Sequence, residues 1–148
     1  MNIHPIVVHF PIALLSLYAI FELVRFQKVL EKPYWFYIKA TLVISGELFA
    51  IAAFLTGPEV EGAKLIEMHE AFAMVAIAIF GLIALGYLSK HFSVLKVFSF
   101  VTRSYILIPL AFLGLVSITI TGGLGGAIVY GTDFDPFMAP IFKILGVY

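Results

Sequence analysis

Long apolar stretches alternate with short polar connections along the chain, and this pattern predicts an all-α membrane protein. A helix of about 20 apolar residues spans the roughly 30 Å hydrocarbon core of a bilayer. Four stretches are long enough: residues 5–26, 34–56, 68–89 and 105–130. We therefore predict a single integral-membrane domain, residues 1–148, built as a four-helix bundle.

Prolines and glycines mark where these helices begin and end. Pro5 and Pro11 lie at the start of the first helix, where the missing N–H of proline has no helical partner to lose. Gly57 and Pro58 stop the second helix. The tail, residues 132–148, is too short to span, so we expect it to lie in the membrane interface or to fold against the bundle.

The composition supports the membrane assignment. The chain has 148 residues, of which 62% are hydrophobic and 12% are charged, more apolar surface than a soluble domain of this size can bury. It contains no cysteine, which excludes disulfides, thiolate metal sites, iron–sulfur ligation and covalent c-type haem. No basic block indicates nucleic-acid binding, and no hydrolase nucleophile motif or Walker loop is present. A homo- or hetero-oligomer is compatible with this composition.

The cations are distributed unequally between the two ends of the predicted bundle. One end, with the connections 27–33 and 90–104, carries seven cations: Arg25, Lys28, Lys32, Lys39, Lys90, Lys96 and Arg103. The other end carries two, Lys64 and Lys143. Cytoplasmic connections are enriched in Lys and Arg, so we expect both termini outside the cytoplasm.

Three of the four histidines fall at helix starts on the predicted outer side: His4, His9 and His69. Residues three and four apart share a helix face, so His9 lies in line with Ala13, and His69 in line with Ala73. Small residues mark the faces where membrane helices meet. We therefore expect His9 and His69 to face the interior, either as ligands or as hydrogen-bond donors between helices. His91 lies at the other end.

A weak internal repeat also suggests that His9 and His69 face the interior of the bundle. His9 precedes Thr56-Gly57 by 47 residues, and His69 precedes Thr121-Gly122 by 52. Two related hairpins would bring both histidines toward a common axis, although so short a shared pattern also arises by coincidence.

The sequence resembles a known family at several of these motifs. They are His4-Pro5, Val8-His9-Phe10-Pro11, Gly46-Glu47-Leu48, Leu55-Thr56-Gly57, Met68-His69-Glu70 and the segment 121–131. The family is the domain of unknown function 2231, predicted bacterial and archaeal membrane proteins. The resemblance implies a four-helix module of the prokaryotic inner or plasma membrane. It also implies an electron-transfer setting, because members are sometimes joined to Rieske-type or cytochrome c-type domains, which here would be separate polypeptides.

The leading functional hypothesis is a cytochrome b-like electron-transport module with b-type haem held by His9 and His69. Neutral imidazoles on facing helices supply the axial ligands that haem iron needs. His4 would support them, and Gly122, Gly123 and Gly125 would let the backbone approach the haem edge closely.

Two alternatives stay open. The first is a copper or zinc site formed by His4, His9 and His69, with Met68, Glu67 or Glu70 as further ligands. His4 and His9 are about 140° apart around a helix, so they chelate together only if the chain before Pro11 is not helical. The second alternative is a cofactor-free anchoring or assembly subunit whose histidines only form hydrogen bonds.

Glu47 lies near the middle of the second predicted span, where a carboxyl group is costly and usually faces a cavity or a partner. We expect it to be protonated and to point into the bundle. It could serve as a proton relay or quinone contact, or simply form a hydrogen bond with Ser117 or a backbone carbonyl.

The cation asymmetry makes a direct prediction about topology. Reporter domains fused after Tyr148 should report a location outside the cytoplasm, and reporters inserted within residues 28–32 should report the cytoplasm. Cytoplasmic activity of the C-terminal fusion would contradict the predicted orientation.

Overall fold

The computed structural model describes residues 3–24, 32–57 and 64–147, and every regular element in these ranges is helical. In chain order, the elements are α1 (His4–Val7), α2 (His9–Leu23), α4 (Pro33–Leu55), α5 (Lys64–Leu88), η1 (Ser93–Thr102), α6 (Ser104–Tyr130) and α7 (Ala139–Leu145). The predicted all-α architecture is confirmed.

The prediction of four apolar helices of membrane-spanning length is also confirmed. The segment His4–Leu23 and the helices α4, α5 and α6 contain 20, 23, 25 and 27 residues, and all four are long and apolar enough to cross a membrane. Helix α5 begins at Lys64, earlier than predicted. Three residues used in the sequence argument, Arg25, Lys28 and Pro58, lie outside the described residues.

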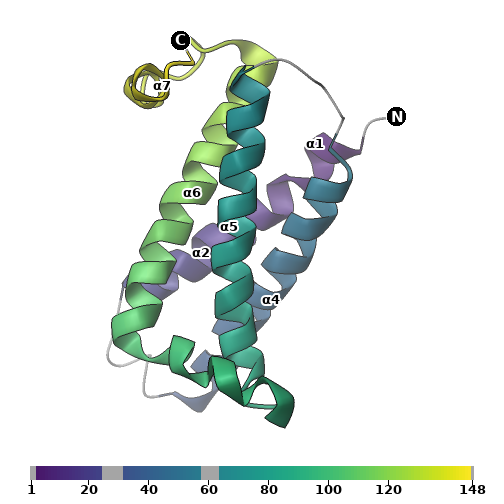
Figure 1. Ribbon diagram of the computed structural model, residues 1–148, viewed down its shortest axis with the longest axis vertical. Coiled ribbons are helices and arrows are strands. Elements are labelled where there is room, and N and C mark those ends of the chain that lie inside the picture. Colours follow the sequence, from purple (N-terminus) through teal and green to yellow (C-terminus); the bar gives the residue numbers. More distant parts are fainter. Residues whose placement is uncertain (1–2, 25–31, 58–63, 148) are drawn as a thin grey trace.

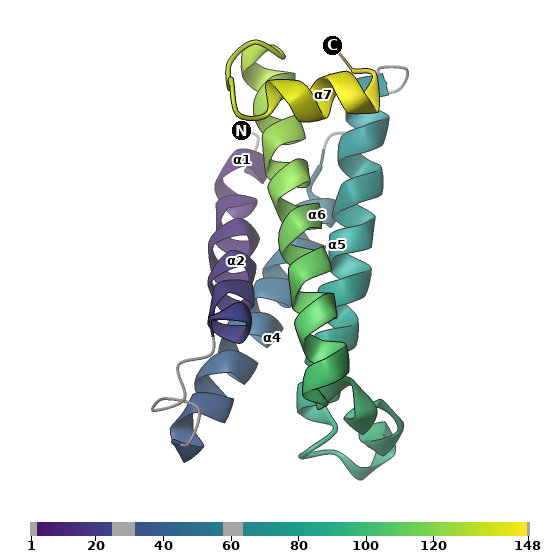
Figure 2. The same cartoon turned by 90° about the vertical axis from the view of Figure 1, so that its left-hand side faces the viewer.

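The spans pack as a closed ring of four helices (Figure 1). Helix α2 pairs with α4, α5 pairs with α6, and the ring closes through α2 with α6 and α4 with α5. Both chain termini lie at the same end of the bundle, here called the histidine end (Figure 1). Helix α7 crosses this end (Figure 2), where the buried side chains of Met138 and Phe142 pack with Leu124 and Ala127. The tail therefore folds against the bundle.

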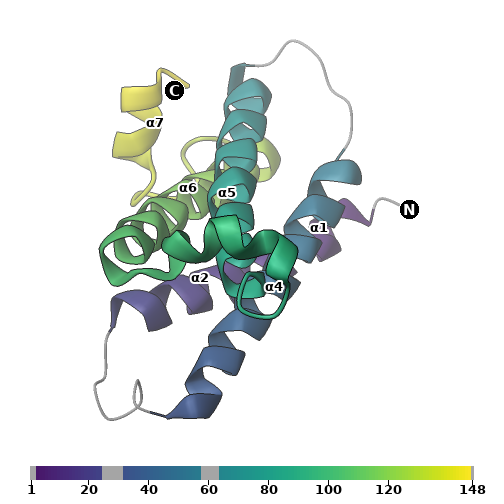
Figure 3. The same cartoon turned by 60° about the horizontal axis from the view of Figure 1, so that its bottom comes forward.

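The 3-10 helix η1 lies across the opposite end, here called the lysine end (Figure 3). It packs against α5 and α6 and buries Val101 completely. Val94 and Val97, on the same element, are 88% and 70% exposed. An element with one face on the bundle and apolar residues on the other is suited to the membrane interface.

Glycines allow the helices to approach each other closely in the bundle core. A Cβ built at Gly46 would lie 2.6 Å from Cδ2 of Leu15, and one at Gly114 would lie 2.7 Å from Cζ of Phe80. Phe80 is fully buried and meets the ring of Tyr18 edge-on, with ring centroids 6.2 Å apart. These contacts confirm that small residues mark the faces where the helices meet.

This packing predicts different effects for two glycines of α6. Gly114→Ala should destabilise the protein by about 1–3 kcal/mol relative to Gly122→Ala, because the new methyl group displaces the buried ring of Phe80. A Cβ at Gly122 would meet Ile12 at an ordinary 3.6 Å, and both variants gain the same helix propensity. Unfolding in mixed micelles measures the difference, and equal stabilities would contradict the packing argument.

Candidate functional site

His4 stands at the start of α1 and reaches the end of α4. Its Nδ1 atom lies 2.9 Å from the carbonyl oxygen of Ala53. A carbonyl oxygen can only accept, so Nδ1 carries the proton and donates it. In a neutral imidazole this places the lone pair on Nε2.

His69, near the start of α5, makes the same contact with α6. Its Nδ1 atom lies 3.0 Å from the carbonyl oxygen of Thr121, so it also donates and places the lone pair on Nε2. Both histidines are half-buried at the histidine end. Each one is bonded to a different helix from its own, which fixes the direction of its ring.

A glycine accompanies each of these hydrogen bonds. A Cβ built at Gly57 would lie 3.7 Å from Cε1 of His4, and one at Gly125 would lie 3.2 Å from Cε1 of His69. Each glycine follows the residue that supplies the carbonyl by four positions, but Gly57 lies just past the end of α4, whereas Gly125 lies inside α6. A side chain would crowd the imidazole only at Gly125, because 3.7 Å at Gly57 is an ordinary van der Waals distance. The two halves of the chain thus share the hydrogen bond from histidine to carbonyl, and only the second half also shows the close glycine contact.

The two histidines that bond across to a neighbouring helix are thus His4 and His69, whereas the sequence pattern assigned the inward-facing role to His9 and His69.

His9 does not face the interior, and the expectation that it would is wrong. Its side chain is exposed, and its Nδ1 atom is bonded to the carbonyl oxygen of Pro5 in the preceding helical turn. The chain is helical from His4 onward apart from a turn at Val8. The condition under which His4 and His9 could chelate together is therefore not met. Within residues 3–24, 32–57 and 64–147, no three His, Asp or Glu side chains form a group that could hold a metal ion.

Of the three glycines predicted near a cofactor, one lies beside a histidine. Gly125 packs against His69, whereas Gly122 faces Ile12 and Gly123 faces Met138. The glycine-rich segment therefore serves two purposes: it admits the imidazole of His69, and it lets the C-terminal segment pack against α6.

Glu47 points into the bundle, as predicted, and is 8% exposed. A Cβ built at Gly81 of α5 would lie 3.2 Å from its Oε1 atom, so the carboxyl group lies over a glycine of the facing helix. Its Oε2 atom is buried and has no hydrogen-bond partner among the described residues. The expected bond to Ser117 or a backbone carbonyl is therefore not formed by this atom.

A buried ion pair near the lysine end escaped the sequence reasoning. Lys39 Nζ donates to Glu22 Oε2 at 2.7 Å, with 10% and 6% of the two side chains exposed. The hydroxyl of Tyr87 donates to the same oxygen at 3.2 Å. The available signal was one acidic and one basic residue at matching depth in neighbouring antiparallel spans, where charges are usually paired.

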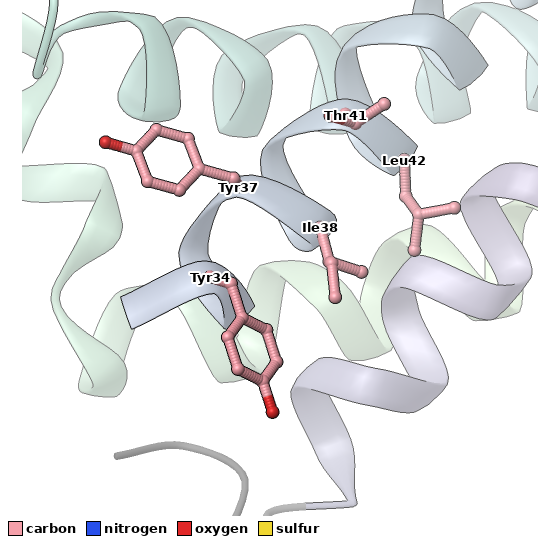
Figure 4. A pocket seen from close by; sticks show the side chains of 5 residues that line it. All are labelled: Tyr34, Tyr37, Ile38, Thr41 and Leu42. Carbon is pink, nitrogen blue, oxygen red and sulfur yellow. The ribbon is translucent and has the colours of Figure 1, made fainter. Parts of the chain in front are cut away.

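The outer surface of α4 carries a hollow of about 380 Å³ lined by Tyr34, Tyr37, Ile38, Thr41 and Leu42 (Figure 4). All five residues belong to the first half of α4, away from the carbonyl of Ala53 that binds His4. The two tyrosine hydroxyls point in different directions (Figure 4). They do not converge on one ligand, and this hollow faces the lipid side of the helix.

Comparisons with known proteins identify the family of the chain. A family model described as "Predicted membrane protein (DUF2231)" matches residues 1–134. No curated protein and no solved structure matches the chain.

The two buried carboxyl groups should respond differently to the same substitution. Glu22→Gln should destabilise the protein by about 3 kcal/mol, because it leaves Lys39 buried without its charged partner. Glu47→Gln should change stability by less than about 1 kcal/mol, because Glu47 is expected to be neutral and Gln keeps its shape. Unfolding in mixed micelles tests both variants. The infrared band of a protonated carboxyl should disappear in Glu47→Gln, and its persistence would show that it belongs to another residue.

Proposed function

The chain belongs to the family of predicted membrane proteins with domain of unknown function 2231, and we propose that it is a membrane-embedded electron-transfer module that holds b-type haem between His4 and His69. The observation that carries this proposal is the pair of hydrogen bonds from Nδ1 of His4 and His69 to backbone carbonyls. His4 takes the place that the sequence pattern assigned to His9.

These hydrogen bonds support a ligand role because they resemble the surroundings of metal-bound histidines in general. Such histidines donate their other ring N–H to a carbonyl or carboxylate, which fixes the tautomer and the ring direction and makes the ligand more basic. His4 and His69 have this arrangement, since each donates Nδ1–H to a backbone carbonyl. Two histidines that only joined helices would need no such agreement in tautomer and carbonyl acceptor.

The number of donors also favours haem over a bare ion. Haem iron takes one or two axial ligands from the protein, and the site offers two imidazoles. Zinc takes three or four protein ligands, a number that the described residues do not bring together at one point.

Bound haem would supply reversible one-electron transfer. The residues of this chain would orient the two imidazoles, and the spans would keep water away from the buried side. The site lies at the histidine end, so the electron partner would approach there. Following the family resemblance, that partner would be a separate Rieske-type or cytochrome c-type protein.

This proposal predicts a coloured protein with a specific ligand pair. Protein purified in mild detergent from haem-supplied cells should show the reduced-minus-oxidised spectrum of six-coordinate, low-spin b-type haem. His4→Ala and His69→Ala should each lose this spectrum, because each removes one iron ligand. His9→Ala is the matched control, since His9 is exposed and lies only five residues from His4. It should keep the spectrum, as should His91→Ala at the other end.

Each other outcome has a definite meaning. Loss of the spectrum in His9→Ala but not in His4→Ala would restore the pair expected from the sequence. A colourless protein that binds copper or zinc stoichiometrically would replace haem with a bare metal site. A protein that binds neither would be an anchoring or assembly subunit whose histidines join helices.

A further inference from the structure

A second polar site lies at the lysine end, far from the histidines. A cavity of about 140 Å³ opens there between α2, α4, α5 and the start of α6. Its polar lining comes from Glu22, Lys39, Tyr87, Lys90, Thr102 and Ser104. Nothing in the proposed haem function uses these residues.

The charges of this cavity leave it positive. One oxygen of the Glu22 carboxylate, Oε2, accepts from both Lys39 and Tyr87, at 2.7 and 3.2 Å. Lys90 adds a second cation. Its Nζ atom lies 4.3 Å from the centre of the Phe36 ring, which holds the ammonium at the cavity by a cation–π contact. Two lysines against one carboxylate give the lining a net charge of one positive unit.

Hydrogen-bond donors accompany this charge. Ser104 is the first residue of α6, and no side chain caps this helix start. Its hydroxyl and the N–H groups of Ser104 and Tyr105 are therefore available to an acceptor, at the end of the helix dipole that attracts anions, whereas the N–H groups of Ile106 and Leu107 donate to the carbonyl oxygen of Arg103. Thr102 differs, because its hydroxyl donates to the carbonyl oxygen of Ser99.

We propose that this cavity binds a phosphate group, carried by a membrane phospholipid or by a soluble phosphate. The ammonium of Lys90, the hydroxyl of Ser104 and the start of α6 are donors that suit an anion with several oxygens. The position of the cavity at the lysine end of the bundle also fits the phosphate of a membrane lipid. The neighbouring η1 exposes Val94 and Val97 beside Lys96, a combination suited to the headgroup layer.

The test compares two lysines at the same end of the molecule. Detergent-solubilised full-length protein is titrated with phosphatidylglycerol, with phosphatidylcholine and with inorganic phosphate, and bound lipid is counted by native mass spectrometry. Lys90→Gln should weaken binding of phosphatidylglycerol about tenfold, the loss of one charge-assisted hydrogen bond. Lys96→Gln is the matched control, because Lys96 is exposed on η1 and does not line the cavity. It should change binding less than twofold, and Lys90→Arg should restore most of the affinity.

The two phosphate sources give different results. Binding of phosphatidylglycerol but not inorganic phosphate identifies a headgroup site, and binding of inorganic phosphate identifies a soluble ligand. Lys90→Gln should unfold at the same temperature as the wild type without ligand, which separates ligand binding from a structural effect. The proposal would be overturned if Lys90→Gln and Lys96→Gln lost equal affinity for phosphatidylglycerol. It would also be overturned if neither phosphatidylglycerol nor inorganic phosphate bound. The haem spectrum is measured separately and fails or succeeds independently.

Discussion

In the hydrocarbon core of a membrane no water is available, so each polar group must find its partner inside the protein. The hydroxyls of Thr56 and Thr121 meet this demand locally, by donating to carbonyls one turn back in their own helices. The imidazoles of His4 and His69 instead bond across to α4 and α6, whereas that of His9 bonds to a carbonyl one turn back. These bonds therefore fix how the helix ends are placed against each other.

Close approach between backbones is the second requirement, and glycine meets it both in the core and at the site. Lipid is as apolar as a leucine side chain, so membrane helices gain stability from tight van der Waals packing and not from leaving water. Gly46 and Gly114 provide this packing for Leu15 and Phe80. Gly125 admits the ring of His69 by the same absence of a side chain. The site thus relies on glycine for close approach, as the core of the bundle does.

The features predicted correctly from the sequence depend on short stretches of chain. The four spans follow from length and hydropathy, and the position of the tail follows from its being too short to span. The choice between His4 and His9 does not follow from such patterns, because both stand near a helix start and only the contact with Ala53 decides which ring faces inward. The Glu22–Lys39 pair likewise depends on the register between α2 and α4. Register is set when the two helices pack against each other, and no short sequence pattern predicts it.

The internal repeat is best described by its contacts. His4 and the Ala53 carbonyl are 49 residues apart, and His69 and the Thr121 carbonyl are 52 apart. Ala53 lies in the last turn of α4, whereas α6 continues past Thr121 to Tyr130. This extension carries Leu124 and Ala127, against which α7 packs. The acceptor thus lies at a helix end in one half and inside a helix in the other. The Thr-Gly pair thus marks a helix end only in the first half of the chain.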